Sequence, residues 1–211
     1  MIYKIAFVAL AFLCTLTCIG QEIKITRLTS TQIPAQIQYS GKFKDGVRFT
    51  DKDGDHIIIT AETGHYVNKQ IKHEDDGGDA ELYAFNYLIK ENSIELKWKV
   101  YDFIHDCPVD YEASFVKNTL QVTDLDHDGA AEVWLMYRTV CHGDVSPEDM
   151  KIIMYQQQQK FAMRGETKVE VAANHYEGGN YKFDKAFTDG PKEFREFAIK
   201  LWNSHIKQHF E

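Results

Sequence analysis

The chain has 211 residues, with 24 lysines and arginines against 32 aspartates and glutamates, so its formal net charge is −8. Nucleic acid and an anionic membrane face both require a positive protein surface. The composition therefore argues against nucleic acid as a partner and allows at most a peripheral contact with a membrane. A chain of this length can bury one substantial core, which predicts a single domain.

Residues 1–20 have the layout of an export signal. Lys4 precedes an apolar stretch over residues 5–19, which is too short for the roughly 20 residues of a membrane span but typical of a signal core. Cleavage near Gly20 would leave residues 21–211 as the mature chain. We therefore expect an exported protein that is periplasmic, secreted or displayed on the cell surface.

The cysteines support this expectation. Cys14 and Cys18 lie within the signal, and neither follows the small residues that precede a lipid-attachment cysteine. Cys107 and Cys141 remain in the mature chain. In an oxidising compartment such a pair favours a disulfide, which would stabilise the fold by roughly 3 to 4 kcal/mol in the chain-entropy model. The alternative is two separate buried thiols.

From residue 22 to about residue 163 the sequence has the pattern of short β-strands. Runs rich in isoleucine, valine and aromatic residues alternate with polar positions and are separated by turn residues. In chain order, "AQIQYS" over residues 35–40 and "KFKDGVRFT" over residues 42–50 are predicted strands. "DKDG" then turns the chain into "HIIITAET" over residues 56–63.

Two further hairpins follow. The longer one covers residues 81–103, where Tyr83, Phe85 and Tyr87 alternate with smaller or polar residues before "KENS" turns the chain. The second covers residues 151–165, with a run of glutamines at its tip. No internal repeat or linker divides the chain, so these hairpins belong to one antiparallel structure, either a sandwich or a curved sheet.

The period changes at the C-terminus. Asp189 is a plausible helix cap and Pro191 lies in the first turn, and apolar residues then recur at steps of three and four as far as residue 206. One amphipathic helix is therefore predicted over about residues 191–209, lying across the sheet. The fold class is mainly β with one C-terminal helix, or α+β by strict counting.

The segment "TDLDHDGAAEVWLMY", residues 123–137, places three aspartates at alternate positions before a glycine and a glutamate. Calcium takes about six to eight oxygen ligands, which a tightly curved loop supplies from alternate residues and from one carbonyl. Two carboxylates about 4 Å apart repel by on the order of 4 kcal/mol at an effective dielectric of 20, so a cation is favoured among them. The predicted calcium ligands are Asp124, Asp126, Asp128, the carbonyl of Ala130, and Glu132. An ordinary solvated turn is the alternative.

The spacing of the acids distinguishes between loop types. An EF-hand carries its bidentate glutamate at loop position 12, where this chain has Leu135, and the acid here stands at position nine. The segment resembles the calcium loops of the FG-GAP and VCBS type, in which DxDxDGxxD/E joins two strands. The resemblance covers about 15 residues and occurs once, so it implies the loop chemistry and not the many-bladed propeller. The weaker echo "FTDKDGDHIII", residues 49–59, lacks the acid at position nine and is predicted to be a hairpin turn.

A longer resemblance rests on "KVYDFIHDCPVDYEASF", "TDLDHDGAAEVWLMYRTVCHGDVSPEDMKIIMY" and "KFAMRG". Together these segments resemble a family of small exported bacterial proteins, common in Bacteroidota, that is named for surface polysaccharide biosynthesis. The resemblance spans most of residues 34–165 and implies an envelope location without any particular reaction. Cys107 and Cys141 stand on either side of the acidic loop in this block, where a bridge would clamp the two sides of the turn.

No catalytic pattern dominates the sequence. Histidines four residues apart near the C-terminus lack an HExxH motif, and no glycine-rich phosphate loop is present. Glu112, Asp144 and Glu148 are carboxylates that a glycosidase could use, but sequence does not give their separation. The sequence therefore favours a protein that binds an envelope glycan or protein over the alternative, a small envelope hydrolase or transferase acting on glycans.

Overall fold

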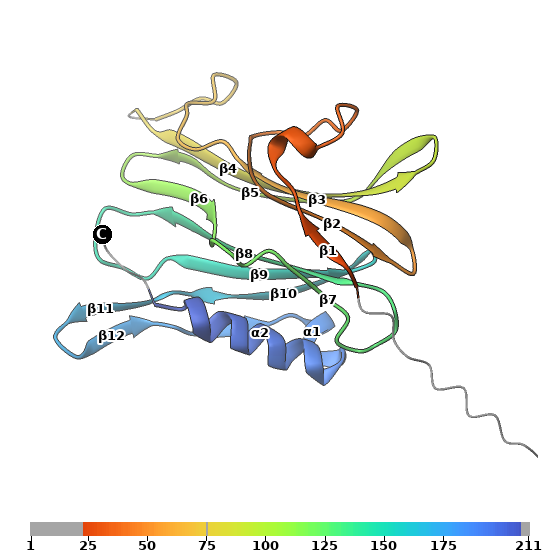
Figure 1. Cartoon of the computed structure of the whole chain (residues 1–211). Helices are drawn as coiled ribbons and strands as arrows, with labels where there is room; N and C mark the ends of the chain where they lie inside the picture. Colours follow the sequence, from red (N-terminus) through yellow and green to blue (C-terminus); the bar gives the residue numbers. More distant parts are fainter. Residues whose placement is uncertain (1–22, 75, 208–211) are drawn as a thin grey trace, which may run out of the picture.

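The computed structural model describes residues 23–74 and 76–207, and the export signal expected over residues 1–20 lies outside this part of the chain. The mainly β fold predicted from the alternating pattern is confirmed. Two antiparallel sheets face each other as a sandwich, and a C-terminal helix covers the outer face of the second sheet (Figure 1).

The first sheet has the strand order β1-β2-β3-β4-β5, and every neighbouring pair is antiparallel. Its strands are β1 (Ile25–Arg27), β2 (Lys42–Asp51), β3 (Gly54–Glu62), β4 (Gly78–Lys90) and β5 (Ser93–Cys107). The hairpins predicted around "DKDG" and "KENS" are both confirmed, because β2 pairs with β3 and β4 pairs with β5.

The predicted strand over residues 35–40 is wrong. These residues follow the short 3-10 helix η1 (Ser30–Gln32) and belong to no strand. Their apolar side chains have another use, because Ile37 and Tyr39 pack against the outer face of the first sheet. Alternation in this segment therefore reflects a stretch of chain that covers a sheet without extending it.

The second sheet has the order β13-β10-β9-β8-β6, and β7 also pairs with β8. Its strands are β6 (Tyr111–Phe115), β7 (Gln121–Thr123), β8 (Glu132–Cys141), β9 (Asp149–Gln156), β10 (Gln159–Glu166) and β13 (Tyr181–Phe183). The hairpin with the glutamine tip is confirmed as β9 and β10. A small separate ribbon consists of β11 (Lys168–Ala172) and β12 (His175–Gly178).

Both faces of the second sheet are buried. In β8, the alternate residues Val133, Leu135 and Tyr137 face the first sheet, whereas Trp134 and Met136 pack against the helices. This explains why "VWLMY", residues 133–137, is apolar without interruption, since a strand covered on both faces has no solvent side. The side chains packed between the two sheets and those packed under the helix therefore form two separate apolar cores.

Two helices occupy the C-terminal region, α1 (Lys185–Asp189) and α2 (Lys192–His205). The apolar residues of α2 recur on one face and pack on the second sheet as predicted. Its first turn differs from the prediction: Pro191 is the cap residue, and Asp189 ends α1, where it pairs with Lys185. The predicted end near residue 209 is also wrong, because the helix ends at His205. Neither helix in the described chain has the length and apolar character needed to cross a membrane.

The disulfide between Cys107 and Cys141 is confirmed, with the two Cα atoms 5.8 Å apart. It joins the end of β5 to the end of β8 and therefore links the two sheets. The expectation that it clamps the acidic loop is wrong. The loop precedes Glu132 at the start of β8, and nine residue steps at about 3.3 Å place the bridge roughly 30 Å from it along the strand.

Candidate metal centre and aromatic surface

The acidic loop connects β7 to β8, and its ends are held by the pairing of Thr123 with Glu132. The backbone turns sharply within it, because His127 has a φ of 56° and Gly129 a φ of 81°. Glycine adopts positive φ angles at the lowest cost, so Gly129 supplies the bend that the sequence pattern requires. The loop is thus a tight turn between two strands of the second sheet.

Three of the predicted ligands converge within this turn. One carboxylate oxygen from each of Asp124, Asp126 and Asp128 lies within 4.8 Å of the others. These side chains also accept local backbone hydrogen bonds, such as the 2.7 Å bond from the Ala130 N–H to Asp128. The group can hold a metal ion. The coordination predicted for the Ala130 carbonyl remains a prediction, although Ala130 itself is fully buried at the exit of the turn.

Glu132, the fourth predicted carboxylate, is fully buried at the first position of β8. Its Oε2 accepts hydrogen bonds from the hydroxyl of Thr123 at 2.7 Å and from the backbone N–H of Leu125 at 2.9 Å. Its Oε1 is buried without a hydrogen-bond partner among the described residues. Burial, with a further contribution from the negative charges of Asp126 and Asp124, raises the pKa of Glu132 to about 7. A cation nearby would relieve this unfavourable burial.

The turn between β2 and β3 lies against the acidic loop. The backbone N–H of Lys52 donates to the carbonyl of Gly129 at 2.8 Å, and the N–H of Ala131 donates to Asp51 at 2.9 Å. The ammonium group of Lys52 lies 2.9 Å from a carboxylate oxygen of Asp128. The weaker acidic echo of the sequence is therefore a hairpin turn, as predicted, and one of its residues supplies a positive charge to the stronger loop. This contact spans 76 residues, and no local pattern could have indicated it.

A second feature lies on the first sheet. Tyr101, Phe103 and His105 alternate along β5, an edge strand, and form a continuous stack with ring centroids 5.2 Å and 4.1 Å apart. We call these three residues the aromatic patch. Tyr101 is 43% exposed and Phe103 is 45% exposed. Alternation in "KVYDFIH" was the signal for this stack, but sequence does not show whether a strand face is covered or open.

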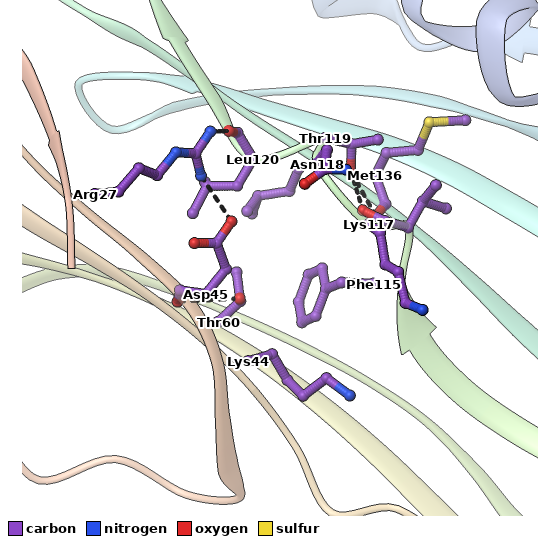
Figure 2. A pocket seen from close by; sticks show the side chains of 12 residues that line it. Arg27, Lys44, Asp45, Thr60, Phe115, Lys117, Asn118, Thr119, Leu120 and Met136 are labelled. Carbon is purple, nitrogen blue, oxygen red and sulfur yellow. Dashed lines mark hydrogen bonds and ion pairs between the residues drawn. The ribbon is translucent and has the colours of Figure 1, made fainter. Parts of the chain in front are cut away.

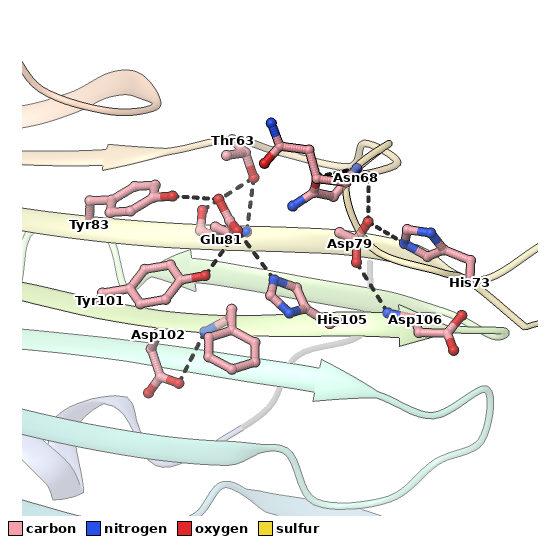
Figure 3. Close-up of polar contacts among 12 residues, drawn as sticks. Thr63, Asn68, His73, Asp79, Glu81, Tyr83, Tyr101, Asp102, His105 and Asp106 are labelled. Carbon is pink, nitrogen blue, oxygen red and sulfur yellow. Dashed lines mark hydrogen bonds and ion pairs between the residues drawn. The ribbon is translucent and has the colours of Figure 1, made fainter.

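The patch is held in place by the buried Glu81 on β4 (Figure 3). Its carboxylate accepts hydrogen bonds from the hydroxyls of Tyr83 and Tyr101 and one from Nε2 of His105 at 3.2 Å. Burial opposes ionisation of Glu81, but hydrogen bonds from Tyr83, Tyr66 and His105 outweigh it and lower the pKa. Burial and the bond to Glu81 raise the pKa of Tyr101 to about 12. The hydroxyls therefore stay protonated and the rings are fixed before any ligand arrives.

A second buried carboxylate, Asp79, precedes Glu81 on the same strand and fixes the loop beside the patch. It accepts from the backbone N–H of Asn68 at 2.6 Å, from that of Asp106 at 3.2 Å, and from Nε2 of His73 at 2.6 Å (Figure 3). Burial opposes its ionisation, but these bonds lower its pKa. Neither carboxylate has the raised pKa of a general acid.

The three carboxylates considered for glycoside hydrolysis lie around the C-terminal end of β8, where Glu112 pairs with Val140. Burial raises the pKa of Glu148, the arginine Arg138 at 3.6 Å lowers it, and the negative charge of Glu112 adds to the rise. Asp144 faces His142 at 3.3 Å, and the charge of His142 also acts to lower the pKa of Glu148. Cys107 offers no thiolate nucleophile in this region, because it is in the disulfide.

The chain matches no protein-family model, no curated protein and no solved structure. The function is therefore argued from the geometry of the acidic loop and of the aromatic patch.

Proposed function

We propose that the protein is an exported module of the cell envelope that binds a surface glycan without catalysis and holds a structural calcium ion in its acidic loop. The aromatic patch carries the binding part of this proposal, and the buried Glu132 beside three aspartates carries the calcium part. The export signal expected over residues 1–20 and the resemblance to the surface polysaccharide family support the envelope location.

The aromatic patch has the properties of a glycan surface. The stacked rings present a row of apolar edges along β5, on which the C–H groups of successive sugar rings can pack, and exposed apolar patches on soluble proteins mark binding surfaces. The hydrogen bonds to Glu81 fix Tyr101 and His105, so binding loses little side-chain entropy. Since the row follows an edge strand on an open face, it suits an extended chain of sugars better than an enclosed small molecule.

Calcium fits the acidic loop better than other common metals. All four predicted side-chain ligands are carboxylates, and hard oxygen donors of this kind are preferred by calcium and magnesium. A flexible loop with several carboxylates favours calcium, because magnesium demands a stricter octahedron and retains more water. The orphaned Oε1 of Glu132 supplies the physical need for a positive charge in this part of the fold.

The rival proposal, a small envelope hydrolase or transferase, rests on the nearness of Glu112 and Glu148. A raised pKa in one carboxyl beside a second carboxylate is the arrangement of an acid and base pair. Arg138 acts against it, because an ion pair at 3.6 Å favours the charged form of Glu148. The E112Q and E148Q variants separate the two proposals: unchanged glycan binding in both, without turnover in the parent protein, supports the binding module.

The glycan proposal is tested by titrating the mature protein with a panel of bacterial surface polysaccharides in a calorimeter. We expect Tyr101→Ala and Phe103→Ala each to weaken binding by about tenfold, as for an aromatic anchor. Tyr176→Ala is the matched control, because Tyr176 on β12 is also 43% exposed but lies outside the patch. Equal losses in all three variants, or no binding of any glycan, would contradict the proposal.

The calcium proposal is tested by thermal melting between zero and 10 mM calcium. Extracellular modules bind with Kd of roughly 10⁻⁴ to 10⁻³ M, so 10 mM calcium should stabilise the protein by about 1.4 to 2.7 kcal/mol. The Asp126→Asn/Asp128→Asn double variant should lose this shift. Asp144→Asn, in an exposed side chain away from the loop, should keep it. A parent protein whose melting ignores calcium would remove the metal from the proposal.

A further inference from the structure

We propose that a cavity beside β1 and β2 binds a small carboxylate with an apolar body. The cavity has a volume of about 510 Å³, which lies in the usual range for small-molecule sites. It opens between the two sheets, whereas the aromatic patch lies along β5 at the opposite edge of the first sheet. This inference is therefore independent of the glycan proposal.

The cavity arises from a gap in the second sheet. On one edge of β8, β6 pairs as far as Tyr137 and β7 begins again at Trp134, so Leu135 and Met136 have no strand beside them. Residues 116–120 loop outward across this gap. The N–H of Val116 donates to the carbonyl of Met136 at 2.9 Å, and the hydroxyl of Thr119 donates to the carbonyl of Val116 at 2.6 Å, so both bonds hold the loop. The opening is thus built into the strand pairing.

The inner wall of the cavity is apolar and already ordered. Leu120 is 4% exposed, and Leu135 and Met136 are fully buried behind it. The ring of Phe115 lies in the middle of the lining residues and is fixed edge-on against Tyr137 (Figure 2). The partly buried ring of Phe115 offers an apolar surface on which an aromatic ring or a short acyl chain can pack, and the buried residues behind it keep that surface rigid.

Positive charges surround this apolar wall, although the whole chain is acidic. Arg27 lies on one side and pairs with Asp45 at 2.7 Å, and Lys44 pairs with Glu62 at 2.8 Å. Lys117 lines the cavity and pairs with no carboxylate among the described residues. Three cations against two carboxylates leave one net positive charge, which Lys117 carries. The site therefore matches a ligand with a single negative charge.

A backbone irregularity directs one of these cations. The pairing of β2 with β3 shifts register between Phe43 and Asp45, so Lys44 is the extra residue of a β-bulge. Bulges turn a side chain away from the regular alternation of a strand and are frequent next to binding sites. Here the bulge places Lys44 at the rim of the cavity, where its ammonium group also pairs with the carboxylate of Glu62.

The lining also limits the chemical class of the ligand. The hydroxyl of Thr60 donates to the carbonyl of Asp45 and that of Thr119 donates within its own loop, which leaves a sugar only the side-chain amide of Asn118 among the neutral polar side chains of the lining. A free phosphate would use the charges but not the apolar wall. An aryl or short acyl carboxylate uses both, with its carboxylate at Lys117 and its body against Phe115.

The test uses 4-phenylbutyrate as the probe, with the mature protein labelled for amide NMR. We expect saturable shifts at residues 115–120 and at Lys44, with a Kd between about 0.1 and 1 mM by calorimetry. Lys117→Gln should weaken binding by about tenfold while its melting temperature stays that of the parent. Lys97→Gln, a lysine of β5 outside this cavity, is the matched control and should bind as the parent does.

Two further probes test whether the ligand needs both the negative charge and the apolar body. The amide of phenylbutyrate, which has the same body without the charge, should bind at least tenfold more weakly, and inorganic phosphate should not shift residues 115–120. The proposal is overturned if the parent shows no shift at these residues up to 10 mM probe. It is also overturned if the amide or phosphate binds as well as the carboxylate, or if Lys117→Gln folds normally and binds unchanged.

Discussion

The two ends of the sandwich are joined in different ways. At one end the disulfide between Cys107 and Cys141 ties β5 of the first sheet to β8 of the second. At the other end, the turn between β2 and β3 meets the acidic loop through one backbone hydrogen bond, one bond from the Ala131 N–H to the carboxylate of Asp51, and the ion pair of Lys52 with Asp128. The same strand, β8, runs from one junction to the other.

The difference assigns separate roles to the two junctions. A covalent bridge keeps its strength whatever ions are present, so long as the compartment is oxidising. The acidic junction depends on charge, because three aspartates converge beside the buried Glu132 and one of them, Asp128, pairs with Lys52. Calcium should therefore stabilise one end of the sandwich and leave the other unchanged.

Removal of the disulfide should cause the largest loss of stability. The bridge closes a loop of 34 residues, so the Cys107→Ala/Cys141→Ala variant should lose about 4 kcal/mol of the free energy of unfolding in the chain-entropy model. For a chain of this size the melting temperature should fall by roughly 10 °C. Calorimetry measures the fall, and the parent protein after reduction is the control. A calcium-induced shift of the same size in the parent and the variant supports independent ends, whereas its loss shows that they are coupled.

Glu132→Gln should change the free energy of unfolding by an intermediate amount, and the sign of the change should depend on calcium. Without calcium the parent buries a carboxylate whose Oε1 has no partner, so the neutral variant should be more stable at pH 8 by roughly 1 to 3 kcal/mol. With calcium the order should reverse, because the variant lacks a charged ligand. Denaturant unfolding with and without 10 mM calcium measures both differences. A variant that is less stable under both conditions would assign Glu132 a purely structural role through Thr123 and Leu125.

The same glutamate predicts a pH dependence. Its pKa is raised from 4.5 to about 7, so between these values the folded state keeps a proton that the unfolded chain has lost. The stability contributed by protonated Glu132 is fully present below pH 4.5 and is lost as the pH rises to about 7, by up to about 3 kcal/mol. The difference in unfolding free energy between parent and Glu132→Gln, measured across this window without calcium, should show the slope. A difference that stays flat would contradict it.

Local patterns predicted most of the fold. Alternation and turn residues located the β2–β3, β4–β5 and β9–β10 hairpins, because their strands and turns are adjacent in sequence. The pattern misassigned residues 35–40, since an alternating segment that covers a sheet looks the same as one that joins it. The C-terminal helix was predicted from its spacing, but its cap was not, because Gly190 and Pro191 allow a short helix to end before it.

The site was predicted only where its residues are close in sequence. Asp124, Asp126 and Asp128 lie in one turn, so their convergence follows from the motif. Lys52 reaches the loop only because the two sheets face each other, and Glu81 fixes the aromatic patch through residues on two strands. Long-range placement of this kind depends on sheet order and register, which a single sequence does not specify.

Lys52→Gln should have the smallest effect and separates two roles of this lysine. If its ammonium and calcium compete for Asp128, the variant should be slightly less stable without calcium but should bind calcium roughly fivefold more tightly, as expected for removal of one nearby positive charge. Calcium titration calorimetry measures the affinity, with Lys97→Gln as the control. In 1 M salt the advantage should shrink, because the charges involved are exposed and screened. Weaker calcium binding in the variant would mean that Lys52 positions Asp128 as a ligand, and the acidic junction would then be built before the cation arrives.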